Sequence, residues 1–164
     1  MADTLVNVKG LSELNAVLQT VAPKVERNVL RTGLRAGANV ILPVAKGNIR
    51  SHSGALATSL KAGTSARGGV VTGYVRTKLY YAPFVEYGTV PHSITAKDRK
   101  GLSVGGLFFQ AVQHPGAKPY PFLRPALDSQ AQAAVIAVGE AIKERLATKE
   151  GLDTAGVLIE GDEP

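Results

Sequence analysis

The chain contains no cysteine and no tryptophan, and none of its apolar runs approaches the length of a membrane span. Without cysteine there is no disulfide bond and no thiolate metal site. A membrane-spanning helix needs about 20 apolar residues, so we expect no membrane association. The first residues lack the basic and apolar regions of a signal peptide, and we expect none.

Signatures of catalytic sites are also missing. The three histidines do not have the spacing of a zinc site, and there is no Gly-x-Ser-x-Gly elbow or Gly-Lys-Ser/Thr phosphate loop. Acidic residues are too sparse outside the C-terminal segment to suggest paired catalytic carboxylates. Glu86 could serve as a general base, but a salt-bridge partner is the favoured interpretation. We therefore expect a protein that is not an enzyme and binds no cofactor.

Charge is unevenly distributed along the chain. Residues 148–164 contain one lysine and five acidic residues, a net charge of −4, which leaves +10 on residues 1–147. We expect one domain over residues 1–147, followed by an acidic tail at residues 148–164 that is mobile in isolation after Gly151. A basic body suggests a polyanion or an acidic neighbouring subunit; plain solubility is the alternative interpretation.

The periodicity of apolar residues predicts an α+β fold. Leucine and valine recur at spacings of three and four over most of residues 12–47, with Pro23 starting a second helix or kinking one long helix. Residues 68–77 are rich in valine and bounded by glycines, which indicates a strand. A second apolar helical face runs from Pro125 to Leu146. We expect an antiparallel sheet with both long helices packed on one face.

A projecting β-hairpin is predicted in the middle of the chain. Residues 90–96 and 102–109 could pair as strands across a basic tip, Lys97–Gly101. The strand end at Leu107–Phe109 is apolar enough to be buried on both faces.

Two segments combine rigid turn residues with large aromatic side chains: Tyr81–Thr89 and His114–Leu127. Eight of the nine aromatic residues lie between Tyr80 and Phe122. We expect the two segments to pack on each other and to bind a neighbour, although from physics alone they could equally wrap their own core. An unpaired charge among aromatics and prolines would be costly, so Glu86 is expected to pair with Arg124. The candidate interface residues are Tyr81, Phe84, Glu86, Tyr87, His114, Pro115, Lys118, Pro121, Phe122 and Arg124.

Two basic clusters are candidates to face DNA or a channel. Lys24, Arg27, Arg31 and Arg35 share one side of the first helical region, and Lys97, Arg99 and Lys100 lie at the hairpin tip. Contacts with phosphate need positive charge without base reading. A solvated helix face, and a charged hairpin end that prevents aggregation, are the alternatives.

Three elements along the chain also resemble a known family. They are Gly54-Ala-Leu-Ala-Thr-Ser59, Tyr81-Ala-Pro-Phe-Val-Glu-Tyr-Gly-Thr89 and His114-Pro-Gly, the last continuing into Pro121-Phe-Leu-Arg-Pro-Ala126. Together they resemble the neck, head–tail joining or tail-completion proteins of long-tailed double-stranded DNA bacteriophages, which are often described as tail components.

The resemblance implies a structural virion protein, assembled in the host cytoplasm and located in the neck or tail. It implies a ring of identical subunits, a hexamer by analogy with relatives, that contacts other neck, connector or tail-tube proteins. Genomic DNA in the channel is a further expected partner. A DNA-binding accessory protein without sequence preference is the alternative function.

Overall fold

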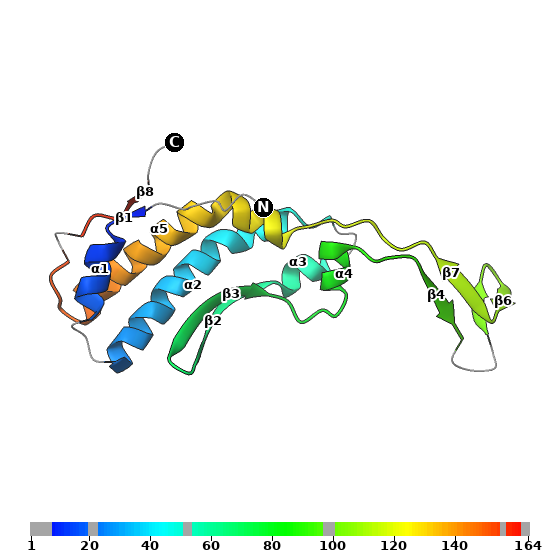
Figure 1. The fold of residues 1–164 in the computed structure, drawn as a ribbon, viewed down its shortest axis with the longest axis horizontal. Helices are drawn as coiled ribbons and strands as arrows, with labels where there is room; N and C mark the ends of the chain where they lie inside the picture. Colours follow the sequence, from blue (N-terminus) through cyan, green and yellow to red (C-terminus); the bar gives the residue numbers. More distant parts are fainter. Residues whose placement is uncertain (1–7, 20–22, 51–53, 97–100, 155–156, 162–164) are drawn as a thin grey trace. The chain divides into compact units, whose positions relative to one another are not determined.

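The computed structural model describes residues 8–19, 23–50, 54–96, 101–154 and 157–161. The chain divides into two compact units (Figure 1). The helical unit comprises residues 1–78 and 122–164, and the inserted unit comprises residues 79–121.

The described residues are 51% helical and 22% strand, with antiparallel pairing throughout, which confirms the α+β class. The helices are α1 Leu11–Leu18, α2 Pro23–Gly47, α3 Ala55–Ser59, α4 Ala82–Tyr87 and α5 Leu123–Lys149. The strands are β1 Val8–Lys9, β2 Lys61–Arg67, β3 Val70–Arg76, β4 His92–Thr95, β5 Leu102–Val104, β6 Leu107–Phe109, β7 Ala111–His114 and β8 Glu160–Gly161.

Two long helices and one hairpin build most of the helical unit. α2 packs along α5 on one side and against the β2–β3 hairpin on another (Figure 1). Pro23 starts α2, as its sequence position indicated, because proline fits the first helical turn, where its missing N–H has no helical acceptor. The described strands form four separate two-stranded pairs instead of one sheet, and α2 is the long helix that packs most extensively on a hairpin.

The hydrophobic core joins residues from both ends of the chain. Leu14 of α1, Val29 of α2 and Leu146 of α5 are buried together with Val157 from the acidic C-terminal segment. The Lys143 ammonium donates a hydrogen bond to the Val157 carbonyl oxygen. The expectation of a mobile tail is therefore wrong for its described part, because apolar residues between the acidic ones dock on α5.

The inserted unit corrects the predicted hairpin. Residues 92–95 pair with β7, in the register Ile94 to Val112, and residues 102–109 fold back on themselves as β5 and β6. Gly105 and Gly106 form the turn between β5 and β6 with φ angles of 59° and 85°, the left-handed pair that a tight two-residue hairpin loop requires. The predicted tip Lys97–Lys100 lies outside the described residues.

The burial predicted for Leu107–Phe109 is also wrong within the chain. Leu107 is 65%, Phe108 73% and Phe109 41% exposed. No described residue between positions 90 and 121 is buried. The β4–β7 and β5–β6 pairs thus have no hydrophobic core of their own.

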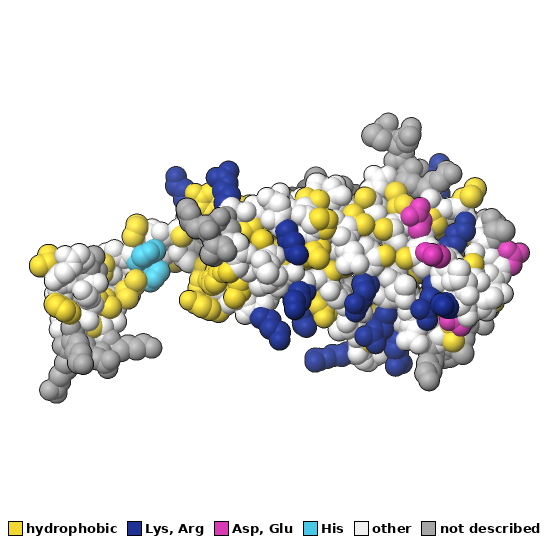
Figure 2. Space-filling model, turned by 180° about the vertical axis from the view of Figure 1, so that it is seen from behind, with side chains coloured by type: hydrophobic (Ala, Val, Ile, Leu, Met, Phe, Trp, Pro, Cys, Tyr) yellow, Lys and Arg dark blue, Asp and Glu magenta, His cyan; other side chains and the backbone are white. Residues whose placement is uncertain are grey.

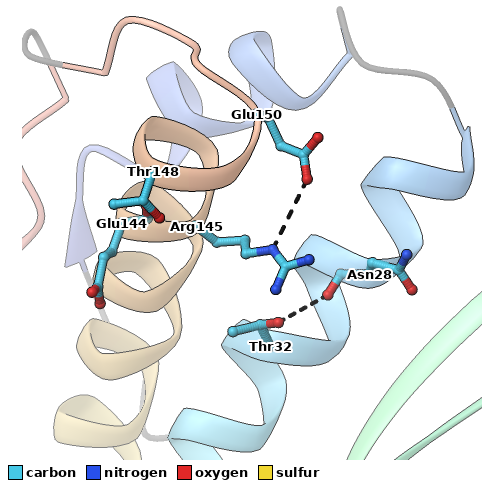
Figure 3. A network of polar contacts seen from close by, with 6 residues as sticks. All are labelled: Asn28, Thr32, Glu144, Arg145, Thr148 and Glu150. Carbon is cyan, nitrogen blue, oxygen red and sulfur yellow. Dashed lines mark hydrogen bonds and ion pairs between the residues drawn. The ribbon is translucent and has the colours of Figure 1, made fainter.

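A polar network lies where the C-terminal part of α5 runs beside α2 (Figure 3). The Arg145 side chain extends from α5 toward α2, and its Nε lies 4.0 Å from Glu150 Oε1. The Thr32 hydroxyl donates to the Asn28 carbonyl at 3.0 Å, within one turn of α2. Both charged side chains are partly exposed, so the ion pair contributes at most about 1 kcal/mol.

Candidate functional site

The two aromatic segments singled out in the sequence meet in the inserted unit. The Thr89 and Ala117 backbones exchange two hydrogen bonds of 2.9 and 3.0 Å, and the Tyr120 N–H donates to the Val85 carbonyl at 2.8 Å. The last turn of α4 is thereby tied to the proline-rich segment. Over residues 114–121, therefore, the expected packing of the two segments is present.

One glycine in each of the two segments allows the backbones to approach closely. Gly88 and Gly116 have φ angles of 72° and 84°, a region that L side chains rarely adopt. A Cβ atom on Gly88 would lie 2.5 Å from the Ala117 carbonyl oxygen, and one on Gly116 would collide with that of Thr89. The Gly116 N–H donates to His114 Nδ1 at 3.1 Å. These residues fix the contact between the α4 segment and residues 114–121.

Several aromatic side chains near this contact are exposed to solvent. Tyr80 is 82%, Phe84 52%, Tyr87 66% and Tyr120 48% exposed. Such a concentration of exposed aromatic surface is typical of a protein-binding site. Tyr80 and Tyr120 were not among the predicted interface residues, although Tyr80 directly precedes the first segment and Tyr120 lies within the second.

The other predicted interface residues differ in accessibility. Exposed ones are Pro115, Lys118, Pro121 and Arg124, and partly buried ones are Tyr81 and His114. Glu86 and Phe122 are buried within the chain at 3% and 0% exposure, so they act in the fold of the free subunit. The pairing of Glu86 with Arg124 stays a prediction.

The helical unit carries an apolar groove of about 440 Å³. Its floor is α2, with Leu34, Gly37, Ala38 and Ile41. One wall is β3, and the other is α5, which contributes the half-exposed Leu127. Polar groups that could orient a small ligand are scarce here, because apart from Tyr74 every lining side chain is apolar or absent.

A basic surface covers α2 and the β2–β3 hairpin. Arg27, Arg31 and Arg35 are exposed, as the helical spacing indicated. The Arg31 Nε donates to Thr64 Oγ1 at 3.4 Å, which joins this row to the hairpin. Nothing is described for the Lys24 side chain or for Lys97, Arg99 and Lys100.

The sequence interpretation missed the hairpin's share of this surface. Lys61 and Arg76 lie directly opposite each other on β2 and β3, and both are exposed. Two like charges at directly opposed positions destabilise a strand pair. The Arg76 guanidinium lies over the Tyr74 ring, 4.4 Å from its centroid.

Between Glu26 and Glu86 the sequence has nine Lys or Arg residues and no acidic residue, and this run could have revealed the surface. Figure 2 shows dark-blue side chains across this unit, with magenta acidic ones near its α1 end.

A metal site and a membrane-crossing helix are both missing from the part of the chain that the structure describes. No group of three or more histidine or acidic side chains there is arranged to hold a metal ion. None of the described helices is both long enough and apolar enough to cross a membrane.

Comparison with known proteins gives one family. No curated protein and no solved structure matches the chain. The family match ends at Gly88, within the first aromatic motif, so the His-Pro-Gly element and α5 lie outside it. Residues 12–88, from α1 through α4, match the family described as "HK97-gp10_like: Bacteriophage HK97-gp10, putative tail-component", and this confirms the resemblance to a phage tail-component family.

Proposed function

We propose that the protein is a structural component of the phage neck, which joins head and tail or completes the tail as a ring of identical subunits. The ring is a hexamer by analogy with relatives, and its other neighbours are neck, connector or tail-tube proteins. The proposal assigns the protein to the virion and gives it no catalytic role.

One observation carries this proposal beyond the family match. Among the residues that the structure describes between positions 90 and 121 of the inserted unit, none is buried, and Leu107, Phe108 and Phe109 are exposed to solvent. An isolated two-stranded hairpin is at best marginally stable in water, and exposed apolar patches mark association sites. Such a unit is suited to a protein that works in an assembly.

A phage carrying a stop codon in this gene tests the role. In a host without suppression we expect DNA-filled heads that carry no tail in electron micrographs of the lysate. The separate tails should be finished if the protein joins head and tail, and unfinished if it completes the tail. Supplying the wild-type protein in trans should restore joined, infectious particles, because the missing part is a joint and not an enzyme for early replication. Normal joined virions without the protein would contradict the proposal.

The basic surface of α2 and the β2–β3 hairpin favours a second candidate function, which is the binding of duplex DNA without sequence preference. Nine positive charges with no acidic residue between them in the sequence suit a phosphate backbone. In a neck this surface would meet the genome in the channel; in the alternative function the protein would act on DNA outside the virion.

Substitution of the opposed pair Lys61 and Arg76 by alanine tests this surface. Each phosphate contact contributes about 0.9 to the slope of log affinity against log salt concentration. We therefore expect the double variant to lower that slope by about 1.8 if both charges touch phosphate. Fluorescence anisotropy with duplexes of unrelated sequence measures it. The control is Lys149→Ala, at the exposed last residue of α5 and outside the sequence between Glu26 and Glu86. An unchanged slope for Lys61→Ala/Arg76→Ala would exclude the pair from DNA contact.

A further inference from the structure

The groove of the helical unit is apolar, open and bordered by a strand with a free edge. Among the described strands β3 pairs only with β2, and β3, not β2, lines the groove. The edge of β3 that does not pair with β2 therefore borders the groove, and no other described strand pairs with it. A free strand edge beside an apolar floor is the usual receptor for an additional strand that brings apolar side chains.

The tip hairpin, β5–β6 at residues 102–109, has the complementary properties. Directly opposed residues of an antiparallel pair point to the same face. Leu102 lies opposite Phe109, and Leu107 is two positions from Phe109 on β6, so these three share one face. Ser103 and Phe108 are opposed on the other face. The tip hairpin is thus a short strand pair with one wholly apolar face, and none of its described side chains is buried.

From these features we propose that the tip hairpin of one subunit occupies the apolar groove of a second copy of this chain. A cavity of about 150 Å³ accommodates one benzene ring, so a groove of about 440 Å³ accommodates the two or three large side chains that this face presents. The donor and acceptor surfaces are different patches of the same chain. Such a contact is heterologous and closes into a ring when the rotation between neighbours allows it.

The composition of the groove argues for this occupant over others. A polyanion would gain nothing from a floor of Leu34, Ala38 and Ile41, and a small polar ligand would find few partners there. A strand pair with an apolar face could cover the apolar floor with its side chains and pair its backbone with the free edge of β3. The inference rests on the proposed assembly of identical subunits and adds the contact that holds neighbours together.

Complementation between two defective variants tests the contact. The donor-defective variant is Leu107→Asp/Phe109→Asp, and the acceptor-defective variant is Leu127→Asp, at a half-exposed groove position on α5. Loss of a central apolar anchor weakens an interface by about 30-fold or more, so each variant alone should remain monomeric in sedimentation at concentrations where the wild type assembles. Mixed together, they retain one intact donor and one intact acceptor, and should form a 1:1 dimer that grows no further.

Matched controls separate this contact from general damage. Ser103→Asp places the charge on the other face of the tip hairpin, and Ala133→Asp places it at an exposed α5 position outside the groove. Both should assemble like the wild type. Circular dichroism establishes that every variant is folded before its assembly is compared.

Cysteine crosslinking gives an independent readout, because the natural chain has no cysteine. A Phe109→Cys protein mixed with a Leu127→Cys protein should form a disulfide-linked heterodimer, which only contact between chains can produce. A wild type that assembles while the mixed variants stay monomeric and uncrosslinked would overturn the hairpin-in-groove contact and leave the ring intact. A wild type that stays monomeric at all concentrations, with no crosslink, would overturn both. If the groove instead receives a different virion protein, the mixed pair fails and that protein crosslinks to Leu127→Cys, which also overturns the proposal.

Discussion

Gly37→Val is expected to lower the free energy of unfolding by about 3 kcal/mol. Gly37 lies on α2 where this helix packs against α5. A Cβ atom there would lie 2.6 Å from Val138 Cγ2 and 2.8 Å from the Ala134 carbonyl oxygen. The second neighbour is backbone and cannot rotate away, so the two helices must move apart. The cost then spreads along the whole α2–α5 contact, which is the largest in the helical unit.

Gly47→Val is the matched control, because it places the same side chain at the last residue of α2. A Cβ atom at Gly47 meets no atom within 4 Å. A change within about 0.5 kcal/mol is expected there. Urea unfolding followed by circular dichroism measures both variants. Equal stability of the Gly37 and Gly47 variants would contradict the close packing of α2 on α5.

Val157→Asp is expected to cost about 3 kcal/mol and to release the C-terminal segment from α5. Val157 is 4% exposed and packs in the core with Ile142 and Leu146. A carboxylate cannot remain there without a partner, so the segment detaches and leaves Leu146 uncovered. The neighbouring Leu158 is 66% exposed, and Leu158→Asp should change stability by no more than about 0.5 kcal/mol. Hydrogen exchange of the α5 amides distinguishes detachment from global unfolding; equal effects of the two substitutions would contradict the docking.

The docked segment also changes how the acidic tail must be tested. Deleting residues 148–164 would remove Val157 together with the charge, so a loss of assembly would report damage to the core. Asp153→Asn removes charge while keeping the apolar contacts. If the acidic tail of one subunit lies on the basic body of the next, this variant should assemble more weakly than the wild type at low salt. At high salt, where exposed charges are screened, the two should not differ.

Helix positions were largely predictable from the sequence, because spacings of three and four encode a helical face directly. Pro23 marked the start of α2, and the stripe from Pro125 to Leu146 lies within α5. These signals are local, since a helix makes its backbone hydrogen bonds within one segment. The docking of Val157 was missed because the charge of its neighbours dominated the interpretation of the tail.

Strand pairing was predicted less well, because the partner of a strand lies elsewhere in the chain. The pairing of residues 90–96 with 102–109 overlooked Gly105-Gly106, a two-glycine signal for a tight turn. Because of that turn, residues 102–109 form a hairpin with each other, and β4 pairs with β7 instead. The apolar character of Leu107–Phe109 was recognised, but an apolar strand does not reveal whether its cover belongs to the same chain.

The candidate surfaces followed the same division. The row Arg27, Arg31 and Arg35 was visible from helical spacing. Lys61 and Arg76 are 15 positions apart, and only the β2–β3 register brings them together. The apolar groove could not be foreseen, because it combines α2, β3 and the distant α5.

Quantitative mass spectrometry of purified virions tests the central claim most directly. A ring component of the neck should be present at a small, fixed copy number per particle, in constant ratio to the other neck proteins across preparations and after high-salt washing. Absence of the protein from infectious virions, or a copy number that falls toward zero with washing, would contradict a structural role in the neck.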